Sequence, residues 1–150
     1  MNDTSVSRRT LAKGVAWTAP AIAVAAAAPS LAASSSPVDP PTVDESRSHG
    51  TRCQGSSQEP SGYNKGYRVF LAVEPADAPA PVLVSVVNGS GKTQTIVGGP
   101  LPVAGRAGVY EYVVEGDSSA TWVDVTYTIG ESTVMPARVQ TSPHCAGYRY

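Results

Sequence analysis

After residue 66 the chain has six short segments rich in apolar residues, and in several of them apolar and polar residues alternate. The pattern is clearest in residues 121–129, where Val123, Val125 and Tyr127 fall on one face. A two-residue period is typical of a strand that buries one face. The six predicted strands cover residues 67–73, 82–87, 93–97, 109–114, 121–129 and 133–139. The residues predicted to face the core in the two clearest strands are Val69, Leu71, Val73, Val123, Val125, Tyr127 and Ile129.

Glycine and proline separate these segments, and no helical period occurs after residue 33. Asn88-Gly89 favours a hairpin turn. Pro136 cannot donate a hydrogen bond to a neighbouring strand, so it places residues 133–139 at a sheet edge or at a bulge. Evenly spaced short strands without helices predict an all-β fold, an antiparallel β-sandwich of immunoglobulin-like or Greek-key type. The cysteine and tryptophan spacing of antibody domains is missing, so this likeness is one of architecture only.

Residues 1–33 show a different pattern, typical of an export signal. Positive charges come first, an apolar run of mostly Ala and Val follows over residues 15–28, and small residues end the segment. This is the order of a secretory signal, which we expect to be helical before its removal. The small residues predict cleavage after Ala32 or after Ala33. The apolar run is shorter than the roughly 20 residues of a membrane-spanning helix and contains Pro20, so no stable membrane span is expected.

The charged start of this segment contains a paired-arginine motif. The motif consists of Ser7, Arg8, Arg9, Leu11 and Lys13. It resembles the twin-arginine (Tat) export signal, in which a hydroxyl residue, two arginines, an apolar residue and a lysine follow in this order. The whole segment is similar to the leaders of small exported actinobacterial proteins. The resemblance implies contact with the Tat translocase and with signal peptidase, and a mature protein that is secreted or associated with the cell envelope.

Beyond the leader, composition changes twice. Residues 34–52 begin rich in Ser and Pro and are predicted to be a disordered linker, which leaves residues 53–150 for the folded domain. Without residues 1–33, 8 of the 11 basic and 11 of the 12 acidic residues remain, a net charge of −3. A chain without surplus positive charge is not expected to bind nucleic acid.

The two cysteines, Cys53 and Cys145, flank the predicted strands. An even number of cysteines in an exported chain predicts a disulfide. Two alternatives stay open: free thiols, or a metal site that adds His49 and His144, since two imidazoles and two thiolates form a ligand set for zinc. The adjacent His144 and Cys145 are poorly placed to bind one tetrahedral ion. We therefore expect the disulfide, no metal and no other cofactor.

The sequence predicts no catalytic residues. Gly91, Lys92 and Thr93 match the end of a phosphate-binding loop, but Val86 stands where that loop needs its first glycine and no helix follows. The acidic residues are scattered, and no pair is predicted to converge as acid–base catalysis requires. Residues 115–118 group oxygen-bearing side chains, which leaves calcium as a weaker alternative there.

Four aromatic residues are candidates for a binding surface, because exposed Tyr and Trp offer large contact area at low entropic cost. They are Tyr63, Tyr67, Trp122 and Tyr148. We expect a non-enzymatic exported protein that acts at or outside the cell envelope through surface contacts with an envelope polymer or protein. One alternative is a carbohydrate- or cell-wall polymer-binding module that uses these rings as stacking platforms. The other is a small secreted metal-dependent enzyme.

Overall fold

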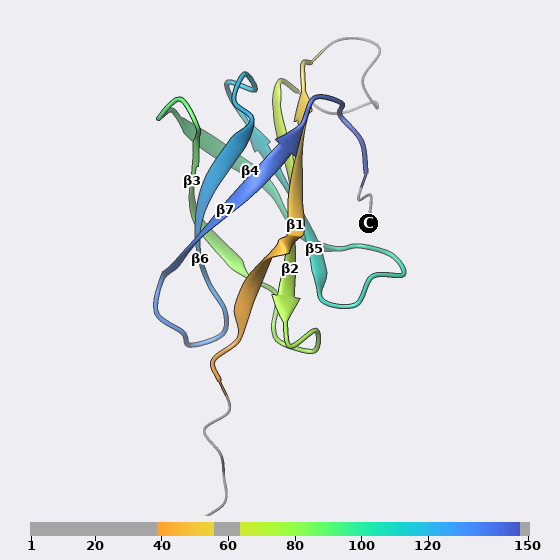
Figure 1. Ribbon diagram of the computed structural model, residues 1–150, viewed down its shortest axis with the longest axis vertical. Coiled ribbons are helices and arrows are strands. Elements are labelled where there is room, and N and C mark those ends of the chain that lie inside the picture. The colour runs from red at the N-terminus through yellow and green to blue at the C-terminus, as the bar shows by residue number, and fades with distance from the viewer. Residues whose placement is uncertain (1–38, 56–63, 148–150) are drawn as a thin grey trace, which may run out of the picture. The chain divides into compact units, whose positions relative to one another are not determined.

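The computed structural model describes residues 39–55 and 64–147, so the predicted export signal and its cleavage site lie outside the described residues. The described residues form seven strands and no helix (Figure 1). The strands are β1 (Thr42–Cys53), β2 (Gly66–Glu74), β3 (Val82–Asn88), β4 (Thr93–Pro102), β5 (Val109–Glu115), β6 (Trp122–Thr128) and β7 (Met135–Ser142). Within the same two segments, no helix is long and apolar enough to cross a membrane.

The strands close into one sheet in the order β1-β2-β5-β4-β3-β6-β7. Neighbouring strands are antiparallel except β1 and β7, which run parallel and lie side by side in Figure 1. These two strands pair only at Gly50–Thr141 and Thr51–Ser142. The all-β prediction is confirmed, but the strands form a closed, barrel-like sheet where the sequence predicted a two-layered sandwich. The closure joins the first strand to the last, and no local sequence pattern encodes such a contact.

Strand β1 corrects the predicted domain boundary, because it occupies most of the predicted linker. Its pairing with β2 is irregular after Asp44, where extra residues bulge out of the ladder. In this bulge Ser48 Oγ donates to the Asp44 carbonyl at 2.7 Å and accepts from the Ala72 amide at 2.9 Å. Hydrogen bonds from polar side chains thus replace missing backbone pairing in this strand. The first strand of the fold therefore begins at Thr42 although its residues do not alternate between apolar and polar.

The inward faces of the strands form one apolar core. The core residues expected from alternation are all buried: Val69, Leu71, Val73, Val123, Val125, Tyr127 and Ile129. Tyr67 and Tyr112, each 1% exposed, add two more large side chains. The Tyr112 hydroxyl donates to the Pro81 carbonyl, and the Tyr67 hydroxyl accepts from the Ala120 amide at 3.2 Å. Burial raises the pKa of Tyr112, so this side chain stays a neutral donor.

Pro136 lies at a sheet edge, as predicted. Its strand partner is Thr126 of β6, and the parallel contact with β1 begins only at Thr141. Near it, the Arg138 amide donates to Glu45 Oε1 at 2.9 Å. A side chain from the β1 bulge thus provides the hydrogen-bond acceptor for a backbone N–H of this edge.

Candidate functional site

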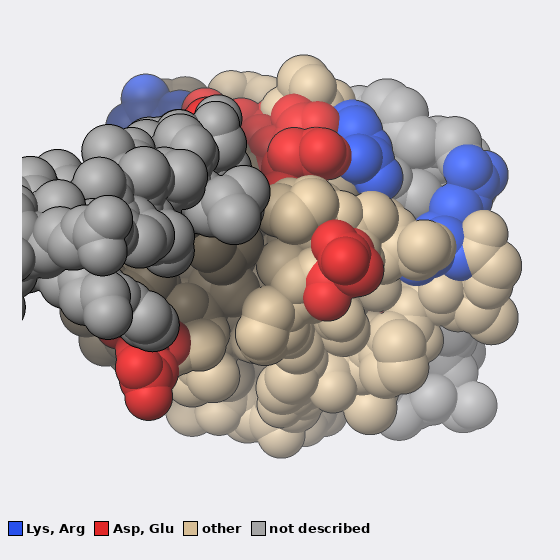
Figure 2. All heavy atoms as spheres, turned by 90° about the horizontal axis from the view of Figure 1, so that it is seen from below, with Lys and Arg blue, Asp and Glu red and all other residues tan. Residues whose placement is uncertain are grey.

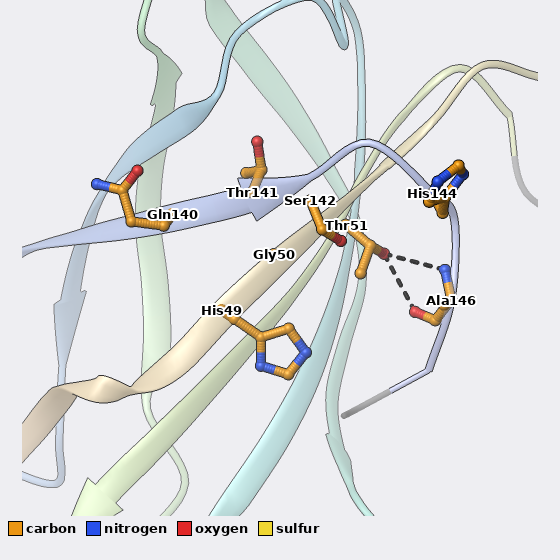
Figure 3. Close-up of a pocket in the computed structure, with 8 residues that line it drawn as sticks. All are labelled: His49, Gly50, Thr51, Gln140, Thr141, Ser142, His144 and Ala146. Atoms are coloured by element: carbon orange, nitrogen blue, oxygen red, sulfur yellow. Dashed lines mark hydrogen bonds between the residues drawn. The ribbon is translucent and has the colours of Figure 1, made fainter. Parts of the chain in front are cut away.

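A pocket of about 350 Å³ lies where β1 meets β7 and the segment after β7 (Figure 3). Figure 3 shows His49 and Thr51, both on β1, on one side and His144 and Ala146 on the other. The described residues that line it are His49, Gly50, Thr51, Gln140, Thr141, Ser142, His144 and Ala146. Sequence reasoning grouped His49 with His144 only in the metal alternative and did not predict this pocket, because neither β1 nor the segment after β7 shows a strand period.

Two links hold the segment after β7 against β1. Thr51 Oγ1 donates to the Ala146 carbonyl at 3.1 Å and accepts from the Ala146 amide at 3.4 Å. Cys53 and Cys145 form a disulfide across 92 residues, with their Cα atoms 4.6 Å apart. The predicted disulfide is therefore confirmed. Because both sulfur atoms are in this bond, neither cysteine can serve as a thiolate ligand in the alternative metal site. In the described part of the chain, no three His, Cys, Asp or Glu residues come close enough to hold a metal ion.

His49 forms the inner wall of the pocket. It is 9% exposed, and its ring stacks on Phe70 with 5.0 Å between centroids. Burial lowers the pKa of His49, which keeps the imidazole neutral at neutral pH. The other polar side chains of the described lining are hydroxyls, an amide and a second imidazole. These groups suit a neutral ligand that forms hydrogen bonds.

A second candidate site is the outer face of β3, β6 and β7, which we call the open face. Cross-strand register places Arg138 opposite Asp124 and Pro136 opposite Thr126. The face is defined by Val82, Val84, Ser85, Trp122, Asp124, Thr126, Pro136 and Arg138. At its lower end, Val82 is 58% exposed and the nearby loop residue Val134 is 57% exposed. Figure 2 shows this end of the domain, where uncharged surface lies between acidic residues and basic residues stand near the rim.

Trp122 and Arg138 are held in place at the upper part of the open face. The guanidinium of Arg138 lies 5.4 Å from the Trp122 ring centroid. It also donates two hydrogen bonds to the Asp124 carboxylate, at 2.7 and 3.0 Å. The indole also rests on Gly89, where a Cβ atom would come within 2.6 Å of the ring. A planar cation over a fixed ring is a preorganised contact surface.

The structure does not gather the four predicted aromatic residues. Trp122 lies on the open face, half-buried, but Tyr67 is 1% exposed and cannot serve as a stacking platform. Tyr67 is in phase with Val69 along β2, a signal that already indicated the core. Tyr63 and Tyr148 lie outside the described residues.

The turn between β3 and β4 is a hairpin, as Asn88-Gly89 predicted. Asn88 is buried, and its Oδ1 accepts from the amides of Ser90 and Lys92 at 3.1 and 2.9 Å. Its Nδ2 donates to the carbonyl of Asp117, 3.0 Å away in the β5–β6 loop. The Lys92 ammonium contacts the Asp117 carboxylate and lowers the pKa of Asp117 to about 2. Lys92 of the phosphate-loop-like sequence therefore pairs within the domain. The same ion pair occupies the Asp117 carboxylate, which the alternative calcium site at residues 115–118 would need as a ligand.

No family model, curated protein or solved structure matches this chain significantly. The pocket and the open face are therefore the two features from which its function is argued.

Proposed function

We propose that this chain is exported through the Tat pathway and acts without catalysis at or outside the cell envelope. The leader motif around Arg8 and Arg9 supports the route. The bond between Cys53 and Cys145 supports the location, because disulfides persist in oxidising compartments and are rare in the cytosol. Intact-mass measurement tests this part: we expect a chain that begins after Ala32 or Ala33, and a full-length chain retained in the cell would contradict it.

The proposal includes an immunoglobulin-like arrangement of the seven strands. In constant-type immunoglobulin domains, one sheet has four strands in the order first-second-fifth-fourth, and the other has the third, sixth and seventh strands. The order β1-β2-β5-β4 followed by β3-β6-β7 supports the same arrangement here. The open face is then the outer side of the three-stranded sheet.

The open face is the proposed contact surface, and its partner is an envelope protein. The observation that carries this is the combination of exposed Val82 and Val84 with the Trp122–Arg138 pair on one uncovered sheet face. Apolar side chains left exposed on a sheet face can form part of an interaction site, and Trp and Arg dominate the energetics of protein contacts. A paired carboxylate at Asp124 keeps the guanidinium oriented before binding.

Retention of the purified mature protein on isolated cell envelope tests this surface. Trp122→Ala and Arg138→Ala should each lower the apparent affinity by about tenfold or more, the effect of a residue that dominates an interface. Arg106→Ala is the matched control, because it removes an exposed arginine from the β4–β5 loop, outside the open face. Equal retention of all three variants, each folded by thermal melt, would contradict the proposal.

The pocket supports a second candidate function, the binding of a neutral sugar unit of an envelope polymer. The observation is its lining of neutral imidazole, hydroxyl and amide groups around about 350 Å³, within the usual size of small-ligand sites. Titration calorimetry with N-acetylglucosamine and galactose tests it. We expect heat of binding that Ser142→Ala and His144→Ala abolish, and no binding of glucuronate. No heat with either neutral sugar would remove this candidate.

A further inference from the structure

Strand β3 has a paired neighbour along its whole length on one side only. It pairs with β6 from Val82 to Asn88, with Val84 as an extra residue at a register shift, whereas its pairing with β4 is limited to Val86 and Val87. Among the described strands, residues 82–85 therefore meet none on the side away from β6. The side chains of Val82 and Val84 in this stretch are 58% and 55% exposed. Unpaired strand backbone is a template for another strand.

The two strands that separate here differ in how their edges are protected. β4 contains Pro100 and ends at Pro102, and proline lacks the N–H that a neighbouring strand would need. From Val82 to Val87, β3 contains neither proline nor charge. Edge strands usually carry such residues to prevent pairing. The edge of β3 is therefore suited to pairing, and that of β4 is not.

The direction of the β3 backbone groups follows from the turn. The Asn88 amide donates to the Lys92 carbonyl at 2.9 Å, on the β4 side. Residues in a strand direct their backbone groups to alternate sides. The register shift between Leu83 and Ser85 adds one residue to β3 at this point. Counting back from Asn88 through that shift places the N–H and C=O of Leu83 on the side without a neighbour.

We propose that β3 pairs antiparallel with β3 of a second copy of this chain, with Leu83 at the twofold axis. Leu83 then exchanges two backbone hydrogen bonds with its counterpart, as directly opposed residues in an antiparallel ladder do. In this register Val82 lies opposite Val84 of the partner subunit, and opposed apolar residues stabilise such a pair.

The second copy is the occupant because the register is self-complementary. The same exposed valines and uncharged backbone occur on both sides of the axis, and twofold dimers of this kind are the commonest oligomers. The charges of Asp124 and Arg138 already pair with each other, so they present no unpaired charge to a second copy. This dimer goes beyond the proposed envelope contact and does not depend on it.

Disulfide trapping in the mature protein tests the register. Val82→Cys and Val84→Cys are prepared separately and then mixed under mild oxidation. We expect covalent dimers in the mixture and none with either variant alone, because only Val82 and Val84 of different subunits are opposed. Val134→Cys, mixed with either variant, is the control for an equally exposed valine outside the edge.

Sedimentation of the unmodified protein completes the test. We expect twice the monomer mass, and a shift to monomer in Val84→Lys but not in Val134→Lys. A monomer at all concentrations overturns the proposal and leaves β3 to a strand from another protein or to none. Cross-linking of Val84→Cys alone, or equal cross-linking by Val134→Cys, overturns the register.

Discussion

The outer side of the domain presents two contrasting regions. Over β1, β2 and β5, the outward-facing residues Phe70, Ala72 and Val109 form a second, buried apolar cluster with Val103 from the β4–β5 loop. Phe70 has the His49 ring against it and the Arg68 guanidinium 5.3 Å from its centroid. On the open face, Val82 and Val84 have no such cover among the described residues. We call the first region the covered face.

This difference shows how one chain divides its apolar residues between stability and contact. On the covered face, polar residues cover the apolar cluster: Ser48 of β1 accepts from the Ala72 amide, and Arg68 of β2 pairs with Glu111 of β5 at 2.6 Å. The open face carries the exposed Val82 and Val84 without such a cover among the described residues. Substitutions on the covered face should therefore cost folding free energy, and those on the open face should cost binding.

The largest expected effect comes from removing the disulfide that links the end of β1, whose polar residues cover the covered face, to the segment after β7. Replacing Cys53 and Cys145 together by Ser should lower the free energy of unfolding by about 4–5 kcal/mol, since the bond spans 92 residues. Urea unfolding of the oxidised protein and the double variant measures this. Reductant should then have no effect on the variant. A loss under about 1 kcal/mol would show that the bond does not constrain the unfolded chain as this mechanism requires.

Truncation of one apolar residue on each face compares them directly. Phe70→Ala should lower the free energy of unfolding by about 3–5 kcal/mol, because it leaves a cavity under His49 and Arg68. Val84→Ala should change it by less than about 0.5 kcal/mol, as expected for an exposed side chain. Urea midpoints of both variants measure the difference. Equal losses would mean that the two faces are packed alike.

A serine on each face gives a smaller, polar version of the comparison. Ser48→Ala should cost about 1–3 kcal/mol, because the Ala72 amide, fully buried, loses its acceptor. Ser85 shares a hydrogen bond with Thr126 at 2.7 Å on the open face, and Ser85→Ala should cost less than about 0.5 kcal/mol, since water replaces it. Thermal melts of both variants measure these losses of stability. A larger loss in Ser85→Ala than in Ser48→Ala would contradict the role of Ser48 as a buried hydrogen-bond acceptor.

The smallest expected effect is a pH dependence at His49. Burial lowers its pKa, so the unfolded chain takes up a proton first as pH falls below about 6.5. The unfolded state then binds more protons than the folded state, and stability falls with pH until the folded imidazole also titrates. Urea midpoints between pH 7.5 and 5.5 should decrease, and His49→Gln should flatten that slope. An identical slope in the variant would mean that groups other than His49 cause the pH dependence.

The sequence was sufficient to predict what depends on local alternation. Val69, Val123 and Tyr127 are buried as predicted, and the hairpin at Asn88-Gly89 follows from its own turn residues. The boundary of the domain could not be predicted this way. Strand β1 buries polar residues such as Ser48 through hydrogen bonds, and its bulge interrupts the two-residue period.

The candidate sites depend on contacts between distant parts of the chain. The pocket requires Thr51 to lie beside Ala146, 95 residues later, and this follows from the parallel pairing of the first and last strands. Likewise, nothing in the period of β2 distinguishes the outward Phe70, which is covered, from the outward Trp122 of β6, which is half-exposed. The cover comes from other strands and loops.

The most direct test of the contrast between the two faces is carbene footprinting of the mature protein, alone and bound to isolated cell envelope. Trp122 and Pro136 should be labelled in the protein alone and protected when it is bound. Labelling of Phe70 should be low in both states. Protection confined to the pocket residues, or no change at Trp122 and Pro136, would contradict the assignment of the open face as the contact surface.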